Sequence, residues 1–171
     1  SSPSLFTSSM VKALSSSLHS LLSSRRIRSL PDSKPMEMVF VLDCSGSMSG
    51  EPIAQAKAAV SKALHMMRPD DTFQIIRFSE SAYKLGSNPI PATPENVRRG
   101  LRYVDALRGM GGTMMIRGIE AALDMKHDDT RLRIVSFMTD GYIGNESEIF
   151  AAIADRIEGS RIFSFGVGTS V

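Results

Sequence analysis

The sequence contains few of the residues on which most zinc and redox sites depend. It has one cysteine, Cys44, three histidines and no tryptophan in 171 residues. A single cysteine excludes an internal disulfide and any zinc site built from several cysteines. No apolar run approaches the roughly 20 residues needed to cross a bilayer, so we expect no membrane span.

The sequence also lacks a strong net charge. The formal value of +2 is too small to favour a nucleic-acid partner. It is unevenly distributed, because residues 1–35 carry +4 and residues 36–171 sum to −2. The length suits one domain with a sizeable core and leaves the oligomeric state open.

Residues 1–35 form a Ser/Arg-rich leader with 13 serines by position 33. Within it, residues 9–24 show apolar side chains at three- and four-residue steps, which is typical of an amphipathic helix. A partly disordered linker is the alternative, and the composition also resembles an organelle transit peptide. Because the chain begins at Ser1, we expect a processed product or a fragment.

From residue 36 onward, apolar runs alternate with amphipathic segments. This alternation, with short loops, predicts an α/β fold: a three-layer Rossmann-like sandwich around a mostly parallel sheet with one short antiparallel edge strand. The expected strands are 36–42, 72–78, 82–85, 133–139 and 161–168, and the expected helices are 51–67, 93–108, 114–126 and 146–158.

Three loops place short oxygen-bearing side chains at strand ends or helix starts. They contain Asp43, Ser45 and Ser47; then Thr113; then Asp140. Ligands in open parallel sheets bind at the carboxyl ends of the strands, so these loops should converge there. Carboxylates and hydroxyls are hard oxygen ligands that suit Mg²⁺ or Mn²⁺ and disfavour zinc or copper. The pattern indicates a metal ion with an open coordination position.

The segments "DCSGSM", "GGT" and "TDG" resemble the metal-ion-dependent adhesion site of von Willebrand factor type A domains. The segments "FVLDCSGSMSG", "FQIIRFSE" and "FSFGVG" are most similar to the type A domains of inter-alpha-trypsin inhibitor heavy chains and bacterial proteins. The resemblance covers about residues 36–168.

The resemblance implies a role for each residue. Ser45, Ser47 and Thr113 would coordinate Mg²⁺, or alternatively Mn²⁺ or Ca²⁺, through their hydroxyls. Asp43 and Asp140 would hold the ion mostly through water. An acidic side chain of a protein partner would complete the coordination, and the loops would move between weak- and tight-binding states.

Two features depart from the family pattern. Met114 stands where relatives often have a polar residue. The chain ends at Val171, where the family has a further helix. Because a parallel sheet needs both faces covered, our hypothesis is that residues 9–24 act as a surrogate covering helix.

The alternatives to a metal site are weaker. Asp43 and Asp140 could be helix caps and turn residues. A phosphatase resembling the haloacid dehalogenases would need an acid where Ser45 stands, and a serine hydrolase would need a histidine base. We therefore expect a non-enzymatic, Mg²⁺-dependent protein-binding domain. An adaptor in an ATPase or chelatase assembly is the first alternative, and a metal-assisted hydrolase is the second.

The resemblance favours the cell exterior, whereas the leader favours an organelle.

Overall fold

The computed structural model describes residues 34–126, 128–140, 152, 156 and the backbone of 161–166. They form a sheet in the order β3-β2-β1-β5-β6, with β4 pairing to β2. The strands are β1 (Met36–Asp43), β2 (Thr72–Phe78), β3 (Ala82–Lys84), β4 (Ile90–Pro91), β5 (Leu132–Thr139) and β6 (Arg161–Gly166). The four long strands are parallel, and β3 and β4 pair with β2 in the antiparallel direction.

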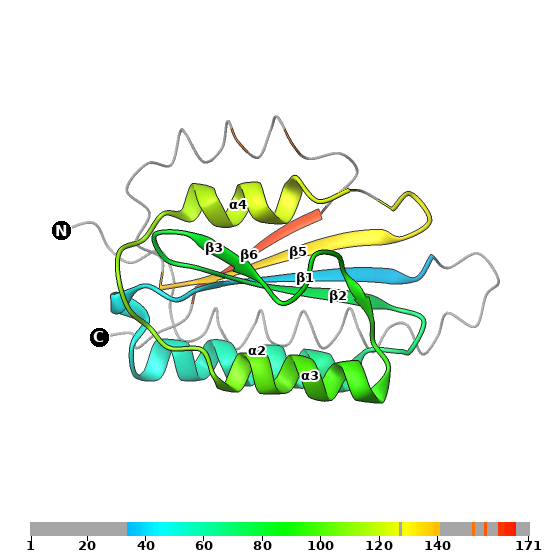
Figure 1. Ribbon diagram of the computed structural model, residues 1–171, viewed down its shortest axis with the longest axis horizontal. Helices are drawn as coiled ribbons and strands as arrows, with labels where there is room; N and C mark the ends of the chain where they lie inside the picture. Colours follow the sequence, from blue (N-terminus) through cyan, green and yellow to red (C-terminus); the bar gives the residue numbers. More distant parts are fainter. Residues whose placement is uncertain (1–33, 127, 141–151, 153–155, 157–160, 167–171) are drawn as a thin grey trace.

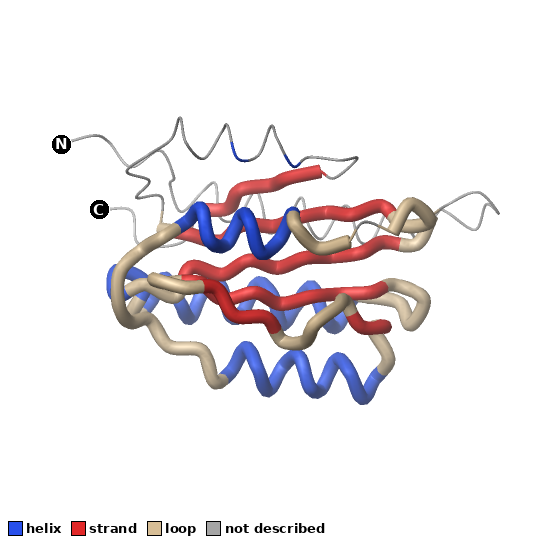
Figure 2. The backbone as a smooth tube through the Cα atoms, turned by 45° about the horizontal axis from the view of Figure 1, so that its top comes forward, coloured by secondary structure: helices blue, strands red, loops and turns tan. Residues whose placement is uncertain are grey.

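Helices cover both faces of this sheet. Helices α2 (Glu51–Met66) and α3 (Pro94–Asp105) lie on one face, and α4 (Met115–Leu123) lies on the other, as Figure 1 shows. The tube view in Figure 2, turned by 45°, shows the strands running side by side as one sheet. This three-layer arrangement confirms the predicted fold class.

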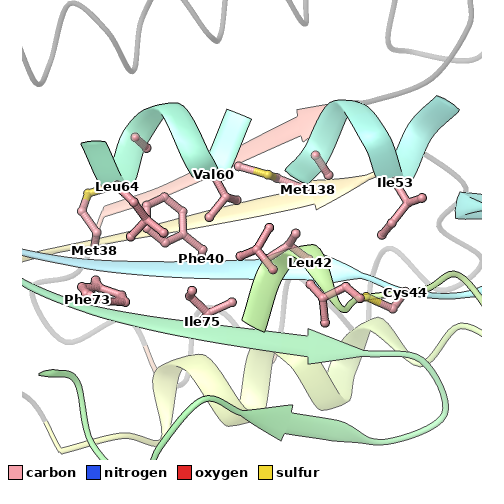
Figure 3. Packing of buried hydrophobic residues seen from close by; sticks show 14 of the residues in the cluster. Met38, Phe40, Leu42, Cys44, Ile53, Val60, Leu64, Phe73, Ile75 and Met138 are labelled. Atoms are coloured by element: carbon pink, nitrogen blue, oxygen red, sulfur yellow. The ribbon is translucent and has the colours of Figure 1, made fainter. Parts of the chain in front are cut away.

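The central strand β1 explains why the sequence showed an apolar run instead of alternation. All eight of its residues are buried, because helices cover both of its faces. Met38, Phe40 and Leu42 pack with the buried face of α2 (Figure 3), in a cluster to which α3 also contributes. Val39 and Val41 point the other way and pack with α4. A strand with two buried faces therefore favours apolar residues on both faces, which gives a continuous apolar run instead of alternation.

The helices begin where their sequences predict. Thr93 caps α3, and its Oγ1 accepts a hydrogen bond of 3.3 Å from the Asn96 amide. Helix α2 starts with proline in its first turn, where the missing amide hydrogen costs nothing. Its buried face consists of Ile53, Ala56, Val60, Ala63 and Leu64.

A buried ion pair stands at the end of the sheet where β1 and β5 begin. Arg133 Nε lies 2.5 Å from Glu37 Oε2, and both side chains are almost fully buried. The same guanidinium donates to the carbonyl oxygens of Met125 and Lys126, at 2.9 and 2.5 Å. Arg133 therefore ties two central strands to the connection that follows α4.

Where both ends of a predicted element lie in the described residues, its bounds agree with the structure to within three residues. The strand β4 and the 3₁₀ turn η2 (Gly46–Met48) were not predicted. Three predictions lie outside the described residues: the leader up to residue 33, the hypothetical helix 9–24 within it, and the chain end. Of the predicted helix 146–158, only residues 152 and 156 are described, and both are helical. No helix in the described part of the chain is long and apolar enough to cross a membrane.

Candidate metal site at the carboxyl edge of the sheet

The carboxyl edge of the sheet is where β1, β2 and β5 end, at Asp43, Phe78 and Thr139. The three strands are parallel and in register, so their last residues lie side by side. The segment that joins α3 to α4 crosses this edge from one helical layer to the other (Figure 1). The loops that contain the predicted ligands thus meet at one edge, as the strand-end rule requires.

Asp43 is the buried centre of the site. Its side chain has no exposed surface. Oδ1 accepts a hydrogen bond of 2.9 Å from the Ser45 amide, and Oδ2 accepts one of 3.0 Å from Thr139 Oγ1. These two bonds fix the carboxylate between the ends of β1 and β5.

Ser45 and Ser47 follow Asp43 on the turn that leads into α2. The 3₁₀ turn η2 closes with a hydrogen bond of 3.0 Å from the Met48 amide to the Ser45 carbonyl. This turn brings the two serine hydroxyl oxygens to 3.1 Å from each other. Ser45 is buried, and Ser47 is exposed. The Asp-x-Ser-x-Ser spacing thus produces a pair of hydroxyls directed to the same place, next to a buried carboxylate.

The segment 106–114, which carries Thr113, is fastened to this turn by backbone hydrogen bonds. The Gly46 amide donates to Gly111 O at 2.9 Å, and the Met110 amide donates to Cys44 O at 2.8 Å. Gly111 has a φ of +79°, which favours glycine. A Cβ at Gly109 would lie only 2.6 Å from the Ser49 amide nitrogen, so a larger residue would push the segment away. Thr113 itself is exposed at this edge.

Asp140 follows directly after β5 and is half-buried. Its charge acts on Asp43, because it adds to the rise of the Asp43 pKa. The structure therefore joins Asp43, Ser45 and Ser47 by hydrogen bonds, and the Asp140 charge acts on Asp43. It places Thr113 on a segment bonded to the same turn.

Burial raises the pKa of Asp43 above its ordinary value of 3.8. Hydrogen bonds from Ser45 and Thr139 oppose this rise without cancelling it. Among the described residues, no lysine, arginine or histidine forms an ion pair with Asp43. A cation next to Asp43 would compensate the cost of burying its charge, and the turn that follows it carries the paired hydroxyl oxygens of Ser45 and Ser47. The residues therefore fit a hard divalent ion.

The donor set is distinctive in its chemistry. Within the part of the chain that the structure describes, no three His, Cys, Asp or Glu side chains form a cluster that could hold a metal ion. Ligation here would rest on hydroxyls as much as on carboxylates, which disfavours zinc and copper.

Two further residues at the carboxyl edge were not among the predicted ligands. Thr139 donates to Asp43, and the "TDG" motif that identified Asp140 already contained it. Glu80 lies against the Gly111–Gly112 backbone. No spacing rule could have found this contact, because Glu80 comes from the turn after β2.

A reactive thiol at Cys44 and a histidine base for a serine nucleophile gain no support from the described residues. Burial raises the pKa of the Cys44 thiol to about 11, so it stays protonated at neutral pH. His65 is exposed in the last turn of α2, whose first turn lies next to the site. A helix of 16 residues is about 24 Å long, so His65 is far from Ser45 and Ser47.

Comparison with known proteins identifies the class to which this fold and site belong. Residues 38–143 match the family model described as von Willebrand factor type A domain. The chain therefore belongs to the von Willebrand factor type A domain family. Members of this family are typically interaction modules, and they often bind a divalent metal ion.

The chain is similar to several larger proteins. It is 31% identical over 136 residues to a von Willebrand factor A domain-containing protein of Dictyostelium discoideum, covering 79% of this chain and 15% of that protein. It is 34% identical over 116 residues to human inter-alpha-trypsin inhibitor heavy chain H4, covering 63% of this chain and 12% of that protein. The chain thus spans a small part of the length of these relatives, and the predicted resemblance to inter-alpha-trypsin inhibitor heavy chains is confirmed.

A solved structure, described as von Willebrand factor type A from Catenulispora acidiphila, shares the fold with a TM-score of 0.69. Its sequence identity to this chain is 22%, and the match covers 80% of this chain and 34% of that one. At this identity the likeness concerns the fold alone.

Proposed function

We propose that this domain binds a protein partner through a Mg²⁺ ion at the carboxyl edge, and that it is not an enzyme. Ser45, Ser47 and Thr113 would hold the ion through hydroxyl oxygens, and Asp43 and Asp140 would hold it mostly through water. The ion supplies a positive centre with a position open to an outside oxygen, and an acidic side chain of the partner fills that position. Mn²⁺ and Ca²⁺ have the same preference for oxygen and could replace Mg²⁺.

The observation that carries this proposal is the state of Asp43. A fully buried carboxylate with a raised pKa and two adjacent hydroxyl oxygens is costly for a fold unless a cation compensates it. The surface beside the site supports a protein as the partner. Met110 and Met114 are 66% and 44% exposed, and both lie on the segment that bears Thr113. Exposed methionines offer adaptable apolar contact, which a protein partner can use and a small anion cannot.

A hydrolase is the less supported reading of the same site. Ser45 stands where a second acid would be needed, and its hydroxyl lies next to Ser47 rather than a base. A role as an adaptor within an ATPase or chelatase assembly would use the same ion and the same acidic partner group. That alternative concerns the identity of the partner and not the chemistry of the site.

Calorimetric titration with Mg²⁺ tests the proposal on the wild type, Asp43→Asn and Asp70→Asn. Asp70 is an exposed aspartate just before β2 starts, at the opposite end of the sheet, and serves as the matched control. We expect saturable binding in the wild type and in Asp70→Asn, and none in Asp43→Asn. Thermal melting in EDTA confirms that each variant is folded. Equal Mg²⁺ affinity in all three proteins would refute the proposed site.

A further inference from the structure

The surface where β3 meets α3 carries an exposed aromatic ring. Of the large apolar and aromatic side chains that the structure describes, only Tyr83, Met110 and Met114 are exposed, and Tyr83 is 52% exposed. Tyr83 pairs with Arg77 in the sheet, one residue before β2 ends at the carboxyl edge. The exposed aromatic and apolar side chains described here therefore lie at the carboxyl edge or immediately beside it.

Tyr83 is held in place although it is exposed. The guanidinium carbon of Arg77 lies 4.3 Å from the centre of the Tyr83 ring, which is a cation–π contact. The Tyr103 hydroxyl, on α3, donates a hydrogen bond of 3.4 Å to the Tyr83 carbonyl oxygen. A ring that is already ordered loses little side-chain entropy when a partner packs on it.

Helix α3 adds two exposed arginines to this surface. Arg99 Nη2 donates a hydrogen bond of 3.2 Å to the carbonyl oxygen of Leu85, the residue after β3. Arg102 lies three residues further along the helix, so the two side chains are neighbours on its surface. Among the described residues, no aspartate or glutamate forms an ion pair with Arg77, Arg99 or Arg102. Three permanent positive charges are therefore left without an anionic partner.

The composition of this surface favours an acidic protein segment over other anions. Tyrosine and arginine are enriched at the centres of protein–protein interfaces. A guanidinium also fits a carboxylate with two parallel hydrogen bonds. Nucleic acid is less favoured, because a chain with a net charge of +2 lacks the broad positive field that attracts a phosphate backbone.

We infer that the surface formed by Arg77, Tyr83, Arg99 and Arg102 is a docking surface for an acidic segment of a protein partner. Tyr83 supplies the apolar contact, and the arginines receive the carboxylates. The inference goes beyond the proposed function, because this surface binds its ligand without a metal ion. Since Tyr83 lies beside the carboxyl edge, one partner segment can reach both this surface and the proposed ion.

Two substitutions test the surface. Arg102→Glu reverses the charge of an exposed side chain, and Tyr83→Ser removes the exposed ring. Lys126→Glu is the matched control, because it makes the same change of charge at an exposed lysine near the opposite end of the sheet. Thermal melting establishes that each variant is folded.

The experiment measures fluorescence anisotropy of a capped, fluorescein-labelled decapeptide made of two Gly-Glu-Leu-Glu-Gly units, in EDTA at low salt. We expect saturable binding to the wild type, and none of the same peptide with glutamine in place of glutamate. Arg102→Glu should weaken binding at least about fivefold, because it removes an exposed ion pair and adds a repulsion of similar size. Tyr83→Ser should weaken it about fivefold, as loss of an interface anchor does. Lys126→Glu should stay within about twofold of the wild type.

The outcomes are independent of the proposed metal site, because EDTA removes the ion. Peptide binding that depends on Arg102 and Tyr83 would support the inference even in a chain that does not bind Mg²⁺. Absence of peptide binding would overturn it. Equal weakening by Arg102→Glu and Lys126→Glu would also overturn it, by showing attraction to the net charge alone. Tighter binding of an oligothymidylate with the same dependence on both residues would overturn it in favour of a nucleic acid.

Discussion

Thr139 Oγ1 donates a hydrogen bond of 3.0 Å to Asp43 Oδ2, and this bond joins the carboxyl ends of the two central strands. Both residues are buried, so Thr139 fixes the carboxylate without being exposed to solvent. Thr113, by contrast, is an exposed threonine at the same edge. Substituting each threonine in turn therefore distinguishes a hydroxyl that stabilises the fold from one that is proposed to bind the ion.

We predict that Thr139→Val lowers the free energy of unfolding in EDTA by about 1–3 kcal/mol, because a buried carboxylate loses its donor. Thr113→Val should leave that free energy within about 0.5 kcal/mol of the wild type, because surface changes are usually small, and should abolish Mg²⁺ binding. Urea denaturation in EDTA and calorimetry with Mg²⁺ measure the two effects. Equal destabilisation by both variants would contradict this division of roles.

The raised pKa of Asp43 predicts that the metal-free domain loses stability as the pH rises. The folded chain binds the Asp43 proton more tightly than the unfolded chain, so the stabilisation is full below the unfolded value and is lost as the pH rises through the folded value. Urea denaturation in EDTA, compared between the wild type and Asp43→Asn, isolates this dependence. The asparagine variant should lack it and should be more stable than the wild type at neutral pH.

Saturating Mg²⁺ should make the wild type more stable than Asp43→Asn at neutral pH. An ion present at 100 times its dissociation constant adds about 2.7 kcal/mol to the wild type, and it adds nothing to a variant that does not bind it. Should Asp43→Asn gain as much as the wild type from Mg²⁺, the ion would lie elsewhere.

The buried pair of Glu37 and Arg133 predicts a strong asymmetry between single and double substitutions. Arg133→Met should cost about 3–5 kcal/mol, because it leaves a buried carboxylate without its partner. Glu37→Leu combined with Arg133→Met should cost much less, because no buried charge is left alone. Urea denaturation of both proteins measures the difference, and similar losses would argue against a buried pair.

The exposed methionines predict a preference among acidic peptides. At saturating Mg²⁺, a peptide with glutamate between leucines should bind more tightly than one with glutamate between glycines. Met110→Ser and Met114→Ser should each reduce that preference by about 1 kcal/mol, or roughly fivefold, with Mg²⁺ affinity unchanged. Calorimetry with both peptides is the measurement. A preference that survives both substitutions would place the apolar contact elsewhere.

Much of this architecture was predictable because it depends on local patterns. The apolar run 36–42 identified the central strand, and the short polar side chains after it identified the carboxyl edge. The serine pair followed from the resemblance of the Asp-x-Ser-x-Ser motif to the adhesion site, and the turn after β1 brings the two hydroxyl oxygens together.

The rest depends on contacts that no local pattern records. Glu37 and Arg133 are 96 residues apart, and each reads as one polar residue in a strand. Glu80 meets Gly112 only because two loops from different layers cross the same edge. The strand Ile90–Pro91 has two residues and contains proline, so it has no strand signal and forms only through its pairing with β2.

The position of β1 at the centre of the sheet has a consequence for hydrogen exchange. This strand is paired on both sides by parallel neighbours and covered on both faces, so its amides cannot reach solvent by fraying from an edge. They should exchange only when the whole domain opens, whereas amides of β3 at the sheet edge should exchange through smaller openings. The slowest protons of β1 would then report the global free energy of unfolding directly, in native buffer and without denaturant.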